Sequence, residues 1–474
     1  MLDTLTIVCV GLGIVVAGIS LRNWRPCIYG LLAFMPFAGI PTIVWYPAPP
    51  ATRVIKDLIF VLPAYIGFAA WTLQRRRRNA VPLAFSWLAI LLTALALIHL
   101  PDADVMVALI GLKTWVFYLP LIALGYHLVN TVADLDRLVR WLLIIGALPI
   151  AAGIVQALLL YSGSPELAYG LYGDAAFDVT QGFSRFEVGT GGLARMASTF
   201  TFVSQYYNFV LAMLCLAYGR WRSMPLRSGS RFWLGILPLA VVVLAGLLTG
   251  ARGAFVMIPL FLVVALALSA DWVGIIQVAL LFAAGLTTAL TLFKTTSEDL
   301  FGVVRELAVD YLTVTQIGEL KQALATTLWG LGTGTNTGPA RFVAVDPTII
   351  TLENYYAKAV MEFGLPGLLV IVLLFAAVLW HGYQASRSTR DPAAKAYANA
   401  LVAFLVVSIV NEWKGAYLDI DPLNVYFWLF VGLLLRIPRM TPQKVSIRHE
   451  IGLVTARAKS LRMRPAVASP ELRR

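Results

Sequence analysis

Three charged residues in well-separated parts of the chain could bind or activate a substrate. Arg195 ends a glycine-containing stretch, Arg252 lies in a tight turn between two apolar runs, and Glu353 follows a long polar interruption. A fixed guanidinium can hold phosphate oxygens in a bidentate manner, and an ionised carboxylate can accept a proton from a sugar hydroxyl. These residue types therefore indicate phosphate binding and base catalysis. The competing interpretations are interfacial arginines that only reach toward water and a helix-start carboxylate without a catalytic role.

Other polar and aromatic residues are weaker candidates. Asn354 is a candidate hydrogen-bonding partner at a helix start, while Tyr355 and Tyr356 are either interfacial aromatics or platforms on which a sugar ring stacks. Lys113 is the one clear charge inside an apolar run, where a lysine is more often paired or directed to the interface than a ligand. The glycines at 330–338 lack the Lys-Ser/Thr completion of a phosphate-binding loop. All three cysteines fall in apolar runs, which predicts buried side chains and no disulfide or metal framework.

Membrane-spanning helices are the elements that must position these residues. The composition is 59% hydrophobic and 13% charged, far from the soluble average. Because backbone groups in lipid must be satisfied internally, apolar runs long enough to cross the bilayer should be helices. The sequence thus predicts an all-α, polytopic membrane helix bundle of about 12–13 transmembrane helices. The expected spans are Leu5–Leu21, Cys27–Trp45, Val54–Leu73, Ala80–His99, Val105–Leu128, Leu138–Leu160, Phe200–Gly219, Phe232–Gly250, Ala254–Ala270, Val273–Phe293, Gly364–His381, Tyr397–Glu412 and Leu423–Leu435.

Basic residues indicate the orientation of these spans. Most of the 37 Lys and Arg residues fall in alternate loops and in the tail, and such an excess marks the cytoplasmic side. The N-terminus is therefore expected outside and the C-terminus inside, with no cleaved signal peptide because no basic residue precedes the first apolar run. We expect one transmembrane domain over 1–436, with long periplasmic loops at about 161–199 and 294–363, and a basic cytoplasmic tail over 437–474. The net charge of +12 is dispersed among loops, which argues against a nucleic-acid partner.

The second long loop is expected to contain regular structure. Apolar residues over Leu300–Leu324 recur near helical spacing, which predicts an amphipathic helix at the outer membrane interface. Thr351 can then cap a short helix, Leu352–Phe363. This helix would hold Glu353 in its first turn, where the positive end of the helix dipole favours an ionised carboxylate. Gly364, followed two residues later by a proline, would end the helix before the next span.

Four motifs in order along the chain resemble those of the O-antigen ligase and Wzy-type polysaccharide polymerase superfamily, over about Gly191–Val370. Leu247-Leu-Thr-Gly-Ala-Arg-Gly-Ala254 looks like the family's Thr-Gly-Ser-Arg-Gly-Ala segment, with alanine in place of serine. Leu328-Trp-Gly-Leu-Gly-Thr-Gly334 is similar to its Gly-x-Gly stretch, and Arg195-Met-Ala-Ser-Thr-Phe200 to its Arg-x-x-Gly-x-Phe. The Thr351–Leu368 segment resembles its His-Asn…Glu-x-Gly-x-x-Gly block.

The resemblance implies an integral inner-membrane glycosyltransferase of GT-C type that uses a polyprenyl-pyrophosphate-linked oligosaccharide at the periplasmic leaflet. It implies that Arg252 and Arg195, together with Lys113 or Arg341, hold the departing diphosphate. Glu353 would be the base, where many ligases of the family carry histidine. Metal-independent inverting transfer is expected, with no cofactor. From the family resemblance, and not from any residue, we expect polymerisation of repeat units in exopolysaccharide or O-antigen biosynthesis in preference to ordinary lipopolysaccharide ligation.

Three alternatives stay open at this point. A ligase would use the same chemistry to transfer the glycan to lipid A or another acceptor. Midplane carboxylates or repeat symmetry would favour a transporter or flippase of lipid-linked sugars. The expected spans are almost free of carboxylates, and the sequence shows no internal repeat. A non-enzymatic assembly component is the third. Beyond its lipid-linked substrate and membrane lipid, the protein's expected partners are a chain-length regulator or export machinery.

Overall fold

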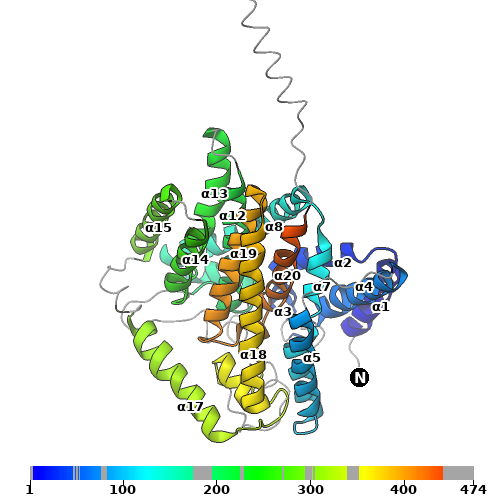
Figure 1. The fold of residues 1–474 in the computed structure, drawn as a ribbon. Helices are drawn as coiled ribbons and strands as arrows, with labels where there is room; N and C mark the ends of the chain where they lie inside the picture. The colour runs from blue at the N-terminus through cyan, green and yellow to red at the C-terminus, as the bar shows by residue number, and fades with distance from the viewer. Residues whose placement is uncertain are drawn as a thin grey trace, which may run out of the picture.

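The chain folds into a bundle of helices that lie at varied angles to one another (Figure 1). This computed structural model describes residues 4–45, 48–49, 52, 54–75, 83–173, 195–224, 229–269, 272–293, 302, 305–338 and 352–440. Six described helical segments are long and apolar enough to cross a membrane: Asp57–Gln74, Val105–Leu128, Val132–Tyr161, Gly274–Leu292, Tyr355–Ser388 and Pro392–Asn411. Four shorter apolar helices accompany them: Thr4–Ser20, Phe85–Ile98, Leu234–Leu248 and Ala254–Ser269.

The helices are labelled as in Figure 1, with η for 3₁₀ or π-helical segments. The first half holds α1 (Thr4–Ser20), α2 (Arg25–Phe34), η1 (Met35–Phe37), α3 (Ile40–Val44), η3 (Asp57–Val61), α4 (Leu62–Arg75), α5 (Leu83–Ile98), α6 (Val105–Leu112), η4 (Lys113–Phe117), α7 (Leu121–Leu128), α8 (Val132–Tyr161), α9 (Pro165–Tyr169), η5 (Gly170–Tyr172) and α12 (Val203–Ser223). The second half holds α13 (Gly229–Leu248), α14 (Ala254–Ser269), α15 (Trp272–Phe293), η6 (Glu306–Thr315), α17 (Gln316–Thr326), α18 (Tyr355–Ser388), α19 (Pro392–Asn411), η8 (Tyr417–Asp419), α20 (Leu423–Arg436) and η9 (Ile437–Arg439).

Large apolar side chains cover much of the outside of the bundle. Ile14 on α1, Ile144 on α8, Leu280 on α15 and Leu369 on α18 are 69%, 72%, 66% and 59% exposed. Contiguous apolar surface on this scale is unfavourable in water and is normal where a protein faces lipid. Together with the long apolar helices, it makes the chain a multi-pass membrane protein built from α-helices.

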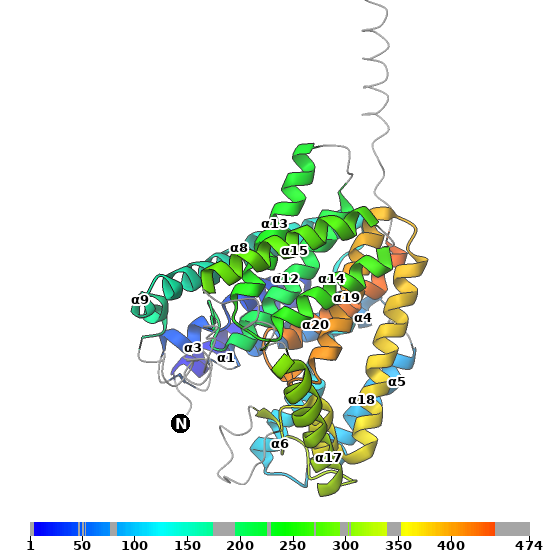
Figure 2. The same cartoon turned by 90° about the vertical axis from the view of Figure 1, so that its left-hand side faces the viewer.

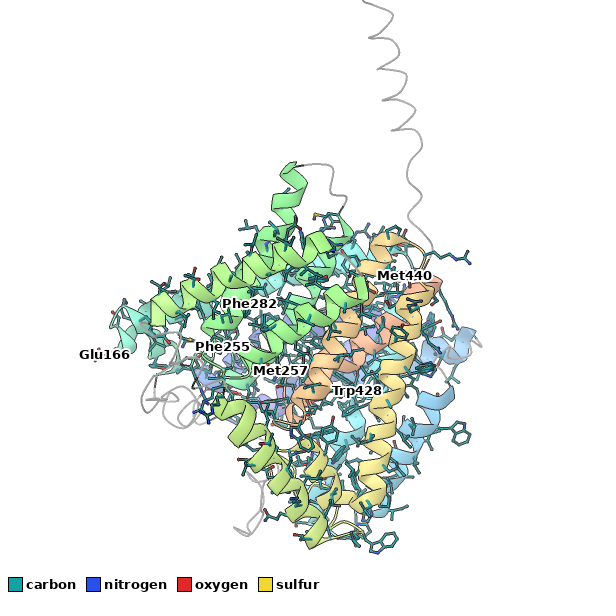
Figure 3. The ribbon with its side chains drawn as sticks, turned by 60° about the vertical axis from the view of Figure 1, so that its left-hand side comes forward. Glu166, Phe255, Met257, Phe282, Trp428 and Met440 are labelled. Carbon is teal, nitrogen blue, oxygen red and sulfur yellow. The ribbon has the colours of Figure 1, made fainter. Side chains whose placement is uncertain are left out.

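The core lies where α12, α19 and α20 pack together with α7 and α13. Two helices touch backbone to backbone there: a Cβ on Gly432 of α20 would lie 2.1 Å from the carbonyl oxygen of Ile122, and one on Gly125 of α7 would lie 2.3 Å from that of Leu429. Only glycine permits this approach, which is common where membrane helices associate by close packing. Side chains fill the remaining space, among them Phe255 and Met257 of α14 and Trp428 of α20 (Figure 3).

The predicted span Cys27–Trp45 is wrong as a single helix, because it is divided into α2, η1 and α3. A loop segment packs directly on the break. Thr199 Oγ1 donates a 2.5 Å hydrogen bond to the carbonyl oxygen of Pro36, and a Cβ on Gly39 would lie 2.5 Å from the Cα of Phe200. Protein groups therefore satisfy the backbone that the break frees, which is the condition for an interrupted helix at membrane depth.

Basic and polar groups join the ends of helices at one end of the bundle. Asp136 near the start of α8 forms an ion pair with Arg220 at the end of α12, and Tyr397 of α19 donates a 2.7 Å hydrogen bond to the same carboxylate. At their other ends α12 and α19 meet again, where Asn411 donates to Asn208 at 3.3 Å. Figure 2 shows α6 and α17 at the opposite end of the molecule from the upper tip of α13.

The second long loop contains the predicted helix, as η6 continued by α17. The helix after it begins later than predicted. Asn354, and not Thr351, is its N-cap residue: the Asn354 side chain accepts hydrogen bonds from the backbone N–H groups of Tyr356 and Ala357 at 2.9 and 3.2 Å. The predicted break at Gly364 is confirmed, because this residue has φ +67° and ψ −161° inside α18. Its left-handed φ is accessible mainly to glycine.

Candidate functional site

Arg195 and Arg252 lie beside each other although they are far apart in the sequence. The backbone N–H of Met196 donates a 3.1 Å hydrogen bond to the carbonyl oxygen of Thr249, which joins the two segments next to the arginines. The turn is tight because Gly250 adopts φ +68°. Burial, followed by the Arg252 charge, lowers the pKa of the half-buried Arg195. Two like charges held together in this way form a site that favours an anion.

Glu353 and Tyr311 form the acidic side of the same region. The Tyr311 hydroxyl donates a hydrogen bond to the Glu353 carboxylate, and burial, followed by this bond, raises the pKa of Tyr311 well above its ordinary value. The placement of Glu353 in a first helical turn is wrong, because it precedes the cap residue of α18. It is exposed and held by a phenol, which leaves its second oxygen available to a hydroxyl group.

The loop between α19 and α20, residues 412–422, was not predicted to belong to the site. Lys414 Nζ donates a 2.8 Å hydrogen bond to the Tyr417 hydroxyl and lies 5.8 Å from the centre of the Tyr311 ring. Trp413 Nε1 donates to the carbonyl oxygen of Leu312 at 2.8 Å, which fastens the α19–α20 loop to η6. The only sequence signal was a lysine between aromatic residues at the end of an apolar run.

Electrostatic contacts show that these segments share one site. Besides Arg252, the groups that act on the pKa of Arg195 are Tyr417, Tyr311 and Glu353, all of which raise it. The structure thus brings together residues from five separate segments of the chain. We call this group the arginine–carboxylate cluster; it consists of Arg195, Arg252, Tyr311, Glu353, Lys414 and Tyr417.

The residues predicted beside Glu353 lie deeper in the protein. Besides capping α18, the fully buried Asn354 donates its backbone N–H to Glu319 Oε2 at 2.8 Å. Tyr355 is buried against Trp115, with ring centres 4.9 Å apart. The half-buried Tyr356 donates its hydroxyl to the carbonyl oxygen of Ile409 at 3.0 Å. The contacts of Asn354, Tyr355 and Tyr356 fix the chain next to Glu353. The same contacts occupy the side chains that were expected to bind a sugar.

Lys113 belongs to a different cluster of charges. Its Nζ lies 2.6 Å from Asp57 Oδ2, and Asp57 also pairs with Lys56 at 2.8 Å and accepts a 2.8 Å hydrogen bond from Tyr118. The prediction that Lys113 is the one clear charge inside an apolar run is therefore wrong, because an adjacent pair of opposite charges is buried with it. Arg341 lies outside the described residues.

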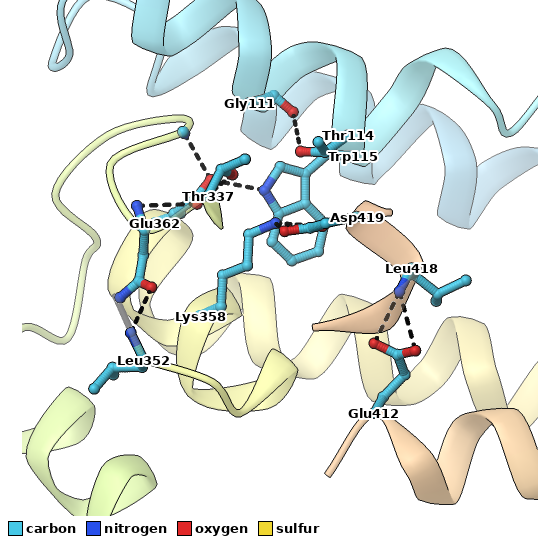
Figure 4. Close-up of polar contacts among 12 residues, drawn as sticks. Gly111, Thr114, Trp115, Thr337, Leu352, Lys358, Glu362, Glu412, Leu418 and Asp419 are labelled. Atoms are coloured by element: carbon cyan, nitrogen blue, oxygen red, sulfur yellow. Dashed lines mark hydrogen bonds and ion pairs between the residues drawn. The ribbon is translucent and has the colours of Figure 1, made fainter. Parts of the chain in front are cut away.

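Further buried charges surround the start of α18 (Figure 4). Lys358 Nζ lies 2.6 Å from both oxygens of Asp419 in the α19–α20 loop, and the two side chains are 0% and 2% exposed. Glu362, fully buried, accepts four hydrogen bonds, three of them from the Gly330–Thr337 segment, which we call the glycine loop. Asp57 and Glu362 lie in helices long enough to cross a membrane, so the helices hold more acidic side chains than the sequence indicated, whereas Asp419 lies in a loop. Hydropathy averaging concealed the acidic side chains in the helices.

Comparisons with protein-family models and curated proteins identified no relative of the chain. Within the described part of the chain, no group of three His, Cys, Asp or Glu side chains is arranged to hold a metal ion. The chemistry of the site therefore has to be argued from the arginine–carboxylate cluster itself.

Proposed function

We propose that the protein is a membrane glycosyltransferase of GT-C type that polymerises polyprenyl-pyrophosphate-linked oligosaccharide repeat units. One observation carries the proposal: Arg195 and Arg252, joined through the Met196–Thr249 hydrogen bond, lie within electrostatic range of Glu353. Paired guanidinium groups suit a diphosphate, and a nearby carboxylate suits a hydroxyl acceptor. The four family-like motifs contribute the polysaccharide substrate class.

The reaction follows from the charges of the cluster. An acceptor sugar hydroxyl attacks the anomeric carbon of the donor while Glu353 accepts the hydroxyl proton. The bond between that carbon and the diphosphate oxygen breaks, and the bond electrons leave with polyprenyl pyrophosphate. Arg195 and Arg252 stabilise the negative charge that grows on the departing diphosphate. Attack from the face opposite the leaving group inverts the anomeric centre. Tyr311 holds the Glu353 carboxylate in place through its hydrogen bond.

The proposed orientation places the cluster at the periplasmic surface of the bacterial inner membrane. The cluster lies at the end of α12 and α19 where Asn411 contacts Asn208, and Arg220 lies at the other end, paired with Asp136. Since basic residues favour the cytoplasmic side, the arginine-rich end is cytoplasmic and the cluster faces outward. Lipid-linked repeat units would then meet the site from the outer leaflet.

The test is turnover of a purified lipid-linked repeat unit by the protein in lipid nanodiscs. Wild type should produce a ladder of longer lipid-linked glycans, and Glu353→Gln and Arg252→Ala should each lower the rate by about 10²–10⁴-fold. Glu166→Gln and Arg387→Ala make the same chemical changes at exposed positions away from the cluster, and both should keep the wild-type rate.

Each other outcome removes part of the proposal. Transfer onto supplied lipid A without a ladder would make the protein a ligase. Full activity of Glu353→Gln would exclude Glu353 as the base. Wild-type protein that moves lipid-linked sugars across the membrane but transfers none would make it a transporter.

A further inference from the structure

A lysine from the α19–α20 loop lies against the turn that carries Arg252. A Cβ on Gly253, the next residue, would lie 3.8 Å from Lys414 Cδ and 3.3 Å from the Tyr207 hydroxyl. Lys414 Nζ is bound to the Tyr417 hydroxyl at 2.8 Å. At this edge of the arginine–carboxylate cluster, Lys414 and Tyr417 therefore meet the turn and the hydroxyl of Tyr207 from α12.

Two features of this edge indicate a ligand. Tyr207 is 1% exposed, and its hydroxyl has no hydrogen-bond partner among the residues that the structure describes. A buried hydroxyl in this condition is rare, and leaving it unpaired costs about 1–3 kcal/mol. The half-buried Lys414 forms no ion pair with any described carboxylate, and its ammonium group carries three donors of which Tyr417 takes one.

We propose that Lys414 and Tyr207 form a subsite for the diphosphate group of the lipid-linked donor, adjoining Arg252. This inference rests on the proposed function for the identity of its ligand. The Lys414 ammonium binds a phosphate oxygen as a point charge, and the Tyr207 hydroxyl donates to another. Cleavage of the sugar bond turns a diphosphate diester into a monoester with an additional negative charge. A mobile ammonium on a flexible stem suits that rise in charge, so the subsite stabilises the leaving group more than the donor.

A purely structural lysine would act differently. If Lys414 only fastened the α19–α20 loop through Tyr417, removing its charge would lower stability without a specific effect on anion binding. Equilibrium binding of a diphosphate lipid separates the two roles because it needs no turnover. Farnesyl pyrophosphate is a suitable probe, with inorganic pyrophosphate and phosphatidylglycerol vesicles as separate arms.

The experiment compares Lys414→Met, Lys414→Arg and Tyr207→Phe with wild type in nanodiscs. Lys395→Met is the matched control, because this lysine lies near the start of α19 and away from the cluster. Lys414→Met should weaken farnesyl pyrophosphate binding by about 10–100-fold, as expected for hydrogen bonds to charged groups. Tyr207→Phe should weaken it by about 3–10-fold. Lys414→Arg should retain part of the affinity, and the control should match wild type.

The three probes show whether the bound anion is a diphosphate or a lipid headgroup. Together with the turnover assay, they also distinguish failure of the subsite from failure of the proposed function. The same dependence on Lys414 with inorganic pyrophosphate supports a diphosphate subsite that does not need the lipid. A dependence on Lys414 seen only with phosphatidylglycerol vesicles would overturn the proposal in favour of a lipid headgroup site. Binding by Lys414→Met within twofold of wild type, with an unchanged unfolding midpoint, would also overturn it. If Lys414 does not affect binding but wild type still makes glycan ladders, the proposed function stands without the subsite. If binding depends on Lys414 but no ladders form, the subsite stands without the proposed function.

Discussion

Replacing Glu362 with glutamine tests whether this buried carboxylate holds the glycine loop on the bundle. Its Oε2 accepts hydrogen bonds from Trp115 Nε1 and from the N–H of Gly334, at 2.7 and 2.6 Å. Its Oε1 accepts from the N–H of Asn336 and the hydroxyl of Thr337, at 3.1 and 2.9 Å. Four donors thus converge on a side chain that is fully buried, where no water can replace a lost acceptor.

The magnitude follows from the geometry of an amide. Glutamine offers one accepting oxygen and one donating NH₂ group, so one pair of donors loses its acceptor. The less costly orientation turns the NH₂ group toward Thr337, whose hydroxyl can rotate to accept, and leaves the Asn336 N–H unpaired. One unpaired buried donor costs about 1–3 kcal/mol, and the bonds that remain lose their charge-assisted strength. Glu362→Gln should lower the free energy of unfolding by about 2–4 kcal/mol.

The three cysteines provide the assay. Cys9, Cys27 and Cys215 are buried thiols, so a thiol-reactive fluorophore reports unfolding of the detergent-solubilised protein in a denaturant titration. Glu166→Gln is the matched control, because it makes the same change at an exposed position of α9. A free energy of unfolding for Glu362→Gln that equals the control's would refute the reasoning. It would mean that the glycine loop is held by its own packing and not by the carboxylate.

Two further predictions use the same assay. Lys358→Met should lower the free energy of unfolding by about 3–5 kcal/mol, because it leaves the buried Asp419 carboxylate unpaired. Adding Asp419→Asn should recover much of that loss. Equal free energies of unfolding for the single and double variants would contradict this. Burial raises the pKa of Glu319 from its ordinary 4.5, so its stabilising contribution is complete below that value and is lost as pH rises through the higher folded pKa. Glu319→Gln should therefore become more stable relative to wild type as pH rises, and a pH-independent difference in unfolding midpoint would rule this out.

The length and hydropathy of the apolar runs located the long helices, because a segment that crosses the bilayer must be both long and apolar. The predicted spans Val273–Phe293 and Tyr397–Glu412 correspond to α15 and α19, which begin one and five residues earlier. The start of α19 is early because Asp391 caps a first turn that precedes the apolar run and contains Lys395. The break in Cys27–Trp45 was signalled by Pro36 and Pro41. The prolines alone could not show that a distant loop would satisfy the freed carbonyl groups.

Residue type and sidedness singled out Arg195, Arg252 and Glu353, but no sequence property showed that they meet. Their meeting depends on a backbone hydrogen bond between distant loop segments and on the Tyr311 contact, neither of which has a local signature. Lys414 was missed because a single lysine after an apolar run is usually an interfacial residue. The buried charges were missed for another reason: oppositely charged residues that pair with each other are tolerated in a core, and averaging over a window hides them.

The α19–α20 loop links the buried charges to the arginine–carboxylate cluster. Asp419 is held by Lys358, Asp421 lies 3.2 Å from Lys56, and Lys414 extends from the same loop toward Arg252. Breaking a buried ion pair is strongly unfavourable, so the fully buried Lys358–Asp419 pair fixes the loop firmly. Because Asp419 and Lys414 belong to the same loop, we expect a change at either residue to affect the position of the other. The ion pairs Lys358–Asp419 and Lys56–Asp421 are therefore expected to help position the loop that carries Lys414.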